Sequence, residues 1–280
     1  MPFQIQVELI YQVLQPSTVL LSLHALSTPN QQLIQETFSV NEGVRCEIFP
    51  LEIGQNRYVR VATGDQEELK LVYEVEVETH PDSQRIRDIR DVPVGHLPRV
   101  ALPYLFPSRY CESDRLYRLA GQLFGKIDHP LAQAQAISDW IFQNVSYVPG
   151  ISNASTGACE TLVERAGVCR DFAHLGIALC RALSIPARYF TGYACGMKPQ
   201  DFHACFEVCV GGDWFVFDPT RLAAPNGLVR IASGRDAADA SLATIFGAMN
   251  LTSMKVSCES SDFQPLHRED LQGRAVNLEP

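Results

Sequence analysis

The sequence predicts an α+β protein in which an N-terminal antiparallel β-sandwich precedes a domain of helices packed on an antiparallel sheet. Strand-like segments fill the first 80 residues, prolines interrupt the next 30, and helical periodicity followed by further strands fills the part up to residue 258. The 280 residues are enough for one large or two medium domains. We therefore expect a sandwich over 1–80, a linker over 81–110, a second domain over 111–258 and a polar, loosely held tail over 259–280.

Short segments of alternating or β-branched residues, separated by turns that contain Pro, Asn and Gly, make up the first domain. Several short strands at this spacing are typical of a β-sandwich. The predicted strands are Ile5–Leu14, Thr18–Leu26, Gln35–Val40, Arg45–Ile53, Arg57–Thr63 and Glu68–Glu78.

The second domain begins after a proline-rich stretch, PVGHLPRVALPYLFP, which excludes a regular element because proline fixes φ and lacks an N–H donor. The hydrophobic period then changes to that of a helix. The predicted helices are Ser113–Gly125, Pro130–Val145 and Gly167–Ser184, and Pro186 ends the last of them. The strands predicted after them are Ala187–Ala194, His203–Val210, Trp214–Asp218, Leu228–Ala232 and Leu251–Cys258.

The net charge and the cysteines indicate which classes of binding partner are excluded and which cell compartment is expected. A net charge of -9 and a pI near 5.3 argue against nucleic-acid and anionic-membrane partners, which require a basic face. The opening MPFQIQVELIYQVLQP alternates like a strand and has no basic segment of a signal peptide, and no apolar run is long enough to span a bilayer. Nine scattered cysteines with no CxxC pair indicate free thiols in a reducing cytoplasm and give little support to a structural zinc site.

A hairpin brings two titratable side chains together. If Gly211 and Gly212 form a two-residue turn, Val210 pairs with Asp213, and Cys205 then pairs with Asp218. The strand period of two places the aromatic and aliphatic side chains on one face. The opposite face carries His203, Cys205, Glu207 and Asp218. His203 and Asp218 become diagonal neighbours, close enough for the carboxylate to hold one imidazole nitrogen.

Cys169 is the candidate nucleophile for that pair. It lies in the first turn of the helix in ERAGVCRDFAHLGIALCRAL, where backbone N–H groups and the helix dipole favour a thiolate. Gly167 leaves room for a substrate, and the N–H of Cys169 can donate to an oxyanion. His174 is a rival base, but its spacing of five residues points it away from Cys169, which predicts a packing role.

Each of these residues also has a structural interpretation. A cysteine at a helix start is commonly a small buried hydrophobe, a strand histidine is commonly satisfied in place, and an Asp before Pro-Thr is commonly a turn residue. Cys180 and Cys195 are interpreted as core. Cys205 and Cys209 cannot share a metal ion, because strand residues four apart lie roughly 13 Å from one another.

The two segments that carry these residues resemble a known family. GVCRDFAHLGIALCRALSIPARYFTGYA, followed by DFHACFEVCVGGDWFVFDPTRLA, is similar to the core of the transglutaminase-like superfamily, in its bacterial branch of cysteine-protease-like members. The stretch Gly234, Arg235, Asp236 and Asp239 is similar to that branch as well. The resemblance implies a papain-like core and a catalytic triad of Cys169, His203 and Asp218.

The resemblance implies thiol-dependent acyl transfer without a cofactor or metal. Hydrolysis of a peptide or amide is favoured, transfer to an amine uses the same triad, and a non-catalytic interaction module on this fold is the third alternative. The family usually has Trp where this chain has Cys205, so the pocket is expected to be reshaped there. The substrate-binding candidates are Tyr147, Asn153 and Cys205.

Overall fold

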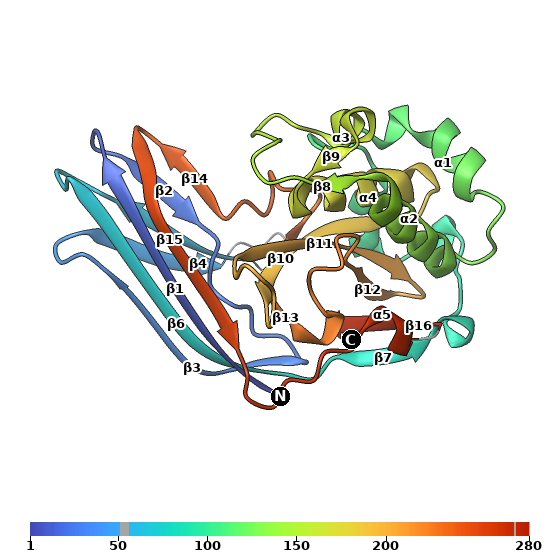
Figure 1. The fold of residues 1–280 in the computed structure, drawn as a ribbon, viewed down its shortest axis with the longest axis horizontal. Coiled ribbons are helices and arrows are strands. Elements are labelled where there is room, and N and C mark those ends of the chain that lie inside the picture. Colours follow the sequence, from blue (N-terminus) through green and yellow to red (C-terminus); the bar gives the residue numbers. More distant parts are fainter. Residues whose placement is uncertain (51–55, 272, 280) are drawn as a thin grey trace.

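A computed structural model describes residues 1–50, 56–271 and 273–279, apart from the side chains of residues 268 and 269. The chain forms a β-sandwich beside a mixed unit in which helices cover one face of a six-stranded sheet (Figure 1). The predicted α+β class, with a strand-rich start and a helical core on an antiparallel sheet, is confirmed. None of the helices in the described ranges is both long and apolar enough to cross a membrane.

Two four-stranded antiparallel sheets form the sandwich. The first has the order β15-β1-β6-β3, and the second has the order β14-β2-β5-β4. In β1, the side chains from Phe3 to Tyr11 are buried at every second position, as the strand period requires. The strands are β1 (Pro2–Val13), β2 (Thr18–Leu21), β3 (Gln31–Val40), β4 (Arg45–Pro50), β5 (Arg57–Ala62), β6 (Glu68–Thr79), β14 (Ala243–Phe246) and β15 (Met249–Glu259). Of the predicted strand Arg45–Ile53, the last three residues lie outside the described residues.

Two of the sandwich strands come from the far end of the chain. β15 pairs with β1, with Val7 opposite Val256, and β14 pairs with β2, with Ile245 opposite Val19. The strand predicted at Leu251–Cys258 exists, but its assignment to the second domain is wrong. A strand's own pattern reflects the surface it packs on and does not identify its partner, so local sequence gave no sign of this return to the sandwich.

The second sheet has the order β13-β10-β11-β12-β16-β7. Helix α4 (Cys169–Ala182) packs on β11 and β10, and it comes so close that a Cβ on Gly176 would lie 2.6 Å from the ring of Phe206. The strands are β7 (Asp82–Arg85), β10 (Ala187–Ala194), β11 (Phe202–Val210), β12 (Asp213–Phe217), β13 (Leu228–Gly234) and β16 (Arg274–Glu279). All three predicted helices occur. The apolar side chains of α4 hold it against β10 and β11.

Three helices are grouped around α4 on the same face of the sheet, and a fourth, short helix lies apart from them beside β16 (Figure 1). They are α1 (Tyr117–Phe124), α2 (Pro130–Asn144) and α3 (Ala158–Glu164), with α5 (Arg268–Leu271) near the C-terminus. Two short strands, β8 (Ser146–Tyr147) and β9 (Ala166–Gly167), pair in parallel just before α4. Short 3-10 turns cover Ile86–Asp88, Val94–His96, Arg99–Leu105, Ser113–Arg115 and Pro225–Gly227. The proline-rich stretch thus contains turns, as expected, whereas the start of the predicted linker forms the edge strand β7.

The C-terminal segment is not the loose tail that its polar composition predicted. β16 lies between β12 and β7, and four of its residues, from Ala275 to Leu278, are buried. Its end is held by a buried charge network, in which Arg188 donates to Glu207 at 2.7 Å and to Glu279 at 2.5 Å. The predicted loose tail is wrong because the ionic partners of this segment, Arg188 and Arg230, lie about 90 and 50 residues away in the chain.

Candidate active site

The β11–β12 hairpin has the predicted register. Val210 pairs with Asp213 and Phe206 with Phe217 across a turn in which Gly211 and Gly212 have φ angles of 69° and 104°. Positive φ at both central turn positions is the conformation that glycine adopts at little steric cost. The aromatic face of the hairpin packs beneath α4. The alternate positions of the two strands carry His203, Cys205 and Asp218.

His203 and Asp218 form a buried ion pair at one end of this hairpin. Nε2 of His203 lies 2.9 Å from Oδ2 of Asp218, and both side chains are almost completely buried. The turn after β12 fixes the carboxylate, because Oδ1 accepts from the N–H and hydroxyl of Thr220 at 2.9 and 2.7 Å, and Oδ2 accepts from the N–H of Ala223 at 3.0 Å. The carboxylate therefore orients the imidazole through one defined nitrogen.

The charges of this pair shift both pKa values. Burial alone would lower the pKa of His203, but the adjacent Asp218 carboxylate raises that pKa well above its ordinary value. Burial likewise opposes ionisation of Asp218, yet His203 and the donors of its turn lower the pKa of the carboxyl group. The site thus favours an imidazolium beside a carboxylate.

The thiol of Cys169 also hydrogen-bonds to the His203 side chain. Nε2 of the same imidazole is bonded to Asp218. Cys169 is half-buried at the first position of α4. The three residues predicted from hairpin parity and helix position are therefore brought together, with the imidazole between thiol and carboxylate.

Asp171 fixes the start of α4, and sequence reasoning had missed it. Its Oδ2 accepts from the N–H of Val168 at 2.9 Å, and its side chain is completely buried. A Cβ on Gly167 would lie 2.7 Å from the Cβ of Asp171, so Gly167 makes room for Asp171. The expectation that it leaves room for a substrate is therefore wrong. An acidic residue at the third helical position is a capping pattern, and that signal was present in the sequence.

Tyr147 lies directly at the thiol-bearing residue. Its hydroxyl oxygen accepts a hydrogen bond from the backbone N–H of Cys169, and its ring packs 5.9 Å from that of Phe172. Burial, together with the neighbouring Cys169, raises the pKa of the phenol. The parallel pair β8–β9 places Tyr147 opposite Gly167, two residues before Cys169. The phenol of Tyr147 thus lies at the backbone N–H of Cys169.

The other two substrate-binding candidates have different positions. Asn153 uses its side-chain oxygen within its own loop, where it accepts from the N–H and hydroxyl of Ser155 at 2.8 and 2.7 Å. Its carbonyl accepts from Arg170 at 2.6 Å, which ties the loop to α4. Cys205 is completely buried beside His203 and packs in an apolar cluster, so it does not form part of an exposed substrate wall.

Cys205 also belongs to the group of side chains that could hold a metal ion. Ligand atoms of His203, Cys205 and Asp218 lie within 4.8 Å of one another. However, burial raises the pKa of the Cys205 thiol to about 12, and zinc binds the thiolate. The histidine and carboxylate are already bonded to each other. The donor set therefore fits an imidazole–carboxylate pair better than a metal site.

His174 has the packing role that its helical position predicted. Its ring lies 5.0 Å from the rings of both Tyr110 and Tyr189, and Nε2 accepts from the N–H of Ala237 at 3.1 Å. The adjacent Asp236 accepts from the N–H of Tyr110 at 3.0 Å. The Gly-Arg-Asp-x-x-Asp stretch thus joins α4 to the segment before α1.

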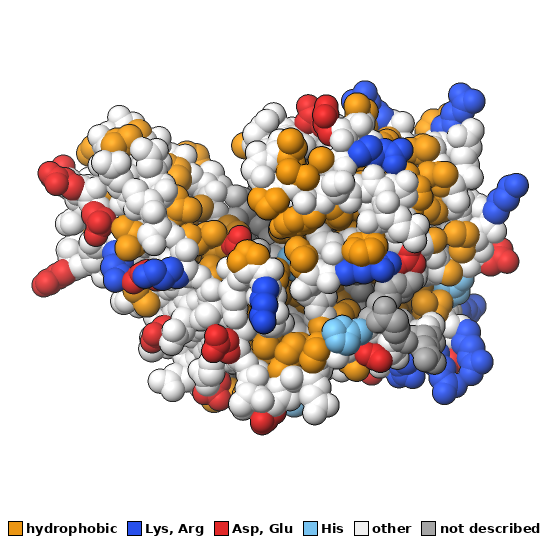
Figure 2. Space-filling view, in the orientation of Figure 1, with side chains coloured by type: hydrophobic (Ala, Val, Ile, Leu, Met, Phe, Trp, Pro, Cys, Tyr) orange, Lys and Arg blue, Asp and Glu red, His pale blue; other side chains and the backbone are white. Residues whose placement is uncertain are grey.

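The face around the site is hollowed between the sandwich and the helical unit, and hydrophobic side chains gather along the hollow (Figure 2). Exposed apolar residues flank the site in the sequence: one ends β8, two lie on the loop after it, and one follows β12. They are Tyr147, Val148, Ile151 and Leu222. Apolar side chains are thus exposed on the segments that adjoin the site in the sequence.

A thiol at a helix N-terminus, beside an imidazole–carboxylate pair on an antiparallel hairpin, defines the class of papain-like α+β folds. Residues 117–219 match the Transglutaminase-like superfamily, and residues 1–99 match the bacterial transglutaminase N-terminal domain. The crystal structure of a "putative cysteine protease" from Cytophaga hutchinsonii is 46% identical, with a TM-score of 0.96 over 100% of this chain and 98% of that one. This chain belongs to the transglutaminase-like superfamily.

Two curated mycobacterial relatives carry no functional description. An uncharacterized protein of Mycobacterium leprae is 27% identical over 165 residues, which span 55% of this chain and 59% of that protein. An uncharacterized protein of Mycobacterium bovis is 32% identical over 114 residues, which span 35% of this chain and 36% of that protein. The chain thus matches less than two thirds of the length of either relative.

Proposed function

We propose that this protein hydrolyses amide or peptide bonds through Cys169, with His203 as general base and Asp218 as the residue that orients it. One observation carries the proposal: the imidazole of His203 contacts the Cys169 thiol on one side and the Asp218 carboxylate, 2.9 Å away, on the other. Nucleophile, base and orienting group in this order are what acyl transfer requires.

Transfer of the Cys169 proton to His203 gives a thiolate beside the imidazolium that Asp218 stabilises, and this thiolate attacks the substrate carbonyl. The oxyanion that forms accepts a hydrogen bond from the hydroxyl of Tyr147, whose oxygen is held by the N–H of Cys169. His203 then protonates the leaving amine, and a thioester remains on Cys169. Water, deprotonated by His203, attacks the thioester and releases the acid and the free thiol.

The substrate class we propose is a peptide or amide with apolar side chains. The support is the hollowed, hydrophobic surface at the site, to which Tyr147, Val148 and Leu222 contribute exposed side chains. The net charge of -9 continues to argue against a nucleic-acid or anionic-membrane partner. The nine cysteines are all free, which supports a reducing compartment such as the cytoplasm, and fractionation of cells that express the protein checks that location.

Transfer to an amine is the second candidate, because the same thioester can be resolved by a primary amine. The thiol of Cys169 is only half-buried, so an amine acceptor could reach the thioester from solvent. We favour hydrolysis because the bacterial relative of 46% identity is named a "putative cysteine protease". A non-catalytic module would not need Asp218 to be held by three separate donors besides His203.

A library of peptides and amides, incubated with wild type and with Cys169→Ala, tests these alternatives. Release of acid and amine by wild type alone supports hydrolysis. A covalent adduct with an added primary amine, formed at the expense of the acid, supports transfer. Failure of wild type to cleave or transfer any member, combined with iodoacetamide labelling of Cys169 no faster than that of other accessible thiols, contradicts the enzymatic proposal.

A further inference from the structure

Two cysteines that the proposed reaction does not use lie against each other where the sandwich strand β15 meets β10 of the six-stranded sheet. Cys195 follows directly after β10, and Cys258 lies in β15, opposite Ile5 of β1. Their two thiols hydrogen-bond to each other. A disulfide requires the sulfur atoms to approach to about 2 Å, and thiols in mutual contact are already directed for that approach.

The backbone around the two thiols is held in place. The N–H of Cys195 donates to the carbonyl of Gly227 at 2.9 Å, and the N–H of Cys258 donates to Oε1 of Gln200 at 2.6 Å. Gln200 belongs to the loop of residues 195–201, which connects β10 to β11 and begins with Cys195 itself. The sandwich therefore already contacts this loop at both of its ends, next to the two sulfur atoms.

The two thiols are not equivalent. The sulfur of Cys195 accepts hydrogen bonds from the Cys258 thiol and from the N–H of Ser260, and these donors lower the pKa of the Cys195 thiol. Donation to Cys195, together with burial, raises the pKa of the Cys258 thiol. The thiolate is the reactive form of cysteine, so Cys195 is the nucleophile of the pair.

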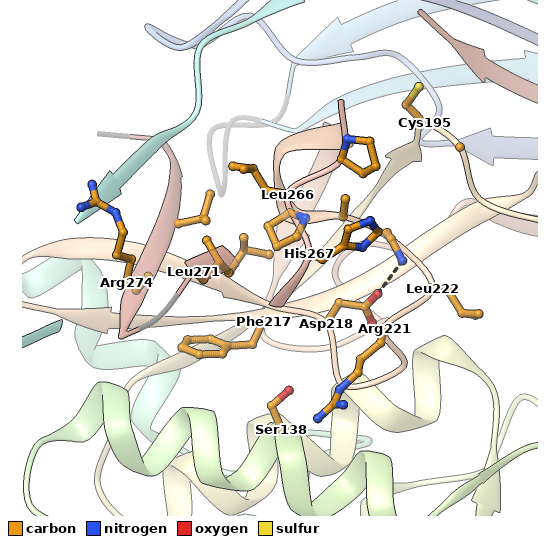
Figure 3. Close-up of a pocket in the computed structure, with 18 of the residues that line it drawn as sticks. Ser138, Cys195, Phe217, Asp218, Arg221, Leu222, Leu266, His267, Leu271 and Arg274 are labelled. Carbon is orange, nitrogen blue, oxygen red and sulfur yellow. Dashed lines mark hydrogen bonds between the residues drawn. The ribbon is translucent and has the colours of Figure 1, made fainter. Parts of the chain in front are cut away.

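Cys195 is also the thiol that a small reagent reaches first. It lines a cavity of about 540 Å³, and Figure 3 shows it at the edge of the group of residues around that cavity. Cys258 is completely buried and is not among the described residues that line the cavity. One thiol thus faces a route for a small oxidant, and the other lies behind it.

We propose that Cys195 and Cys258 form a redox-sensitive pair, which a peroxide converts to a disulfide between the sandwich and the loop of residues 195–201. The Cys195 thiolate attacks one peroxide oxygen, the O–O bond breaks, and a sulfenic acid forms while the leaving hydroxide takes up a proton. The Cys258 sulfur then attacks the Cys195 sulfur, the S–O bond breaks, and the hydroxyl group leaves as water with the Cys258 proton. Two thiols are oxidised while one hydrogen peroxide is reduced to two water molecules, and a dithiol reverses the change.

The disulfide would join the two units of the fold by a covalent bond. It closes a loop of about 60 residues, which restricts the unfolded chain and therefore stabilises the folded protein. The proposal goes beyond the hydrolytic function and does not depend on it, because neither Cys169 nor His203 takes part in the oxidation.

Treatment of Cys169→Ala with hydrogen peroxide tests the proposal, since this variant lacks the half-buried thiol that would compete for the oxidant. The remaining thiols are alkylated, and digestion with trypsin and Asp-N places Cys195 and Cys258 in separate peptides that contain no other cysteine. The two peptides are expected to be crosslinked, with a mass lower by two hydrogen atoms than their sum, and dithiothreitol is expected to separate them. The urea midpoint of the oxidised protein is expected to lie about 1 M above that of the reduced protein.

Three further variants, made in the same background, separate the roles of the thiols. Cys258→Ala is expected to stop at the sulfenic acid of Cys195, which dimedone traps, and Cys195→Ala is expected to leave Cys258 as a thiol. Neither should show the shift in urea midpoint. Cys209→Ala removes another buried thiol and should crosslink as its parent does.

The crosslink and its reversal are measured in the parent protein, so they decide the proposal even if a variant does not fold. The proposal is overturned if peroxide yields no peptide that joins Cys195 to Cys258, or if other pairs of cysteines crosslink at the same rate. An oxidised protein that is no more stable than the reduced one would equally overturn it.

Discussion

The carboxylate of Asp218 lies 2.9 Å from Nε2 of His203, and every one of its other hydrogen bonds comes from the five residues that follow it. The turn Asp218–Ala223 therefore fixes the carboxylate through its own donors, and the carboxylate in turn orients one imidazole nitrogen of His203. Because the turn directly follows β12 and the histidine lies in β11, the register of the hairpin decides whether the two residues meet. This relationship makes the charge of the pair experimentally separable from its position.

Asp218→Asn should preserve the position and remove the charge. We expect amide hydrolysis to fall by about two to four orders of magnitude, because the asparagine no longer stabilises the imidazolium. Initial rates against the best substrate, compared for wild type, Asp218→Asn and Cys169→Ala, check this. A variant with wild-type rates would show that His203 needs no orienting carboxylate.

The same substitution should change the pH dependence of stability. The pKa of His203 is raised above 6.5, so its contribution to the free energy of unfolding is complete below pH 6.5 and is lost as the pH rises through the higher folded value. The pKa of Asp218 is lowered below 3.8, so its contribution is present above that pH and is lost as the pH falls below it. Urea unfolding from pH 3 to 10 should show both declines in wild type and neither from this pair in Asp218→Asn.

Two thiols contact His203, and they should react very differently. Cys169 is half-buried at a helix N-terminus, whereas Cys205 is completely buried and its pKa is raised to about 12 by burial. Iodoacetamide at neutral pH is therefore expected to alkylate Cys169 and to leave Cys205 unmodified in the native state. Peptide mapping after brief labelling measures both sites, and labelling in urea provides the fully reactive control. Preferential modification of Cys205 would reverse the assignment of the nucleophile.

The position where the family usually has Trp can be tested by restoring it. Cys205 is completely enclosed by an apolar cluster that includes Phe190 and Val216, so an indole in its place must displace core atoms. We expect Cys205→Trp to cost about 1 to 3 kcal/mol of unfolding free energy or more. Cys205→Ala, which removes one sulfur atom, should cost less. A Cys205→Trp variant as stable as wild type would mean that the site retains space for the indole.

Sequence reasoning predicted the candidate site better than it predicted the domain boundaries. Parity along a hairpin with an obligate glycine turn placed His203 near Asp218, because a two-residue register leaves little freedom. β15 and β16 were misassigned because their partners, β1 and β12, are fixed by long-range pairing and buried ionic contacts. The burial of Cys205 was missed for a related reason. The alternation of side chains along a strand shows which face of the sheet a residue is on, but not which other segments cover that face.

Asp171 should be needed to hold Cys169 in place. Its loss in Asp171→Ala leaves the N–H of Val168 without its partner, and we expect a cost of about 1 to 2 kcal/mol in stability together with a loss of activity. Asp171→Asn keeps a side-chain oxygen acceptor and should recover most of the stability. Urea denaturation and thiol labelling of all three proteins separate a helix-start defect from global unfolding. Equal stability of Asp171→Ala and wild type would exclude the capping role.

The buried charge network should be essential for the six-stranded sheet. Glu207 is completely enclosed and binds both Arg188 and Arg230, and burial opposed by these two cations leaves the pKa of its carboxyl group lowered to about 2. Glu207→Gln leaves two buried guanidinium groups without their main counter-charge.

We expect Glu207→Gln to cost about 3 to 5 kcal/mol, because breaking one side of a buried pair exposes the full desolvation penalty of the other. Glu47→Gln, which removes the partner of Arg60 in an exposed pair, should cost less than about 1 kcal/mol. Denaturant unfolding of the two variants at neutral pH compares them directly. If both cost the same, the anchoring of β16 would have to come from its apolar residues, Ala275, Val276 and Leu278, and not from the network.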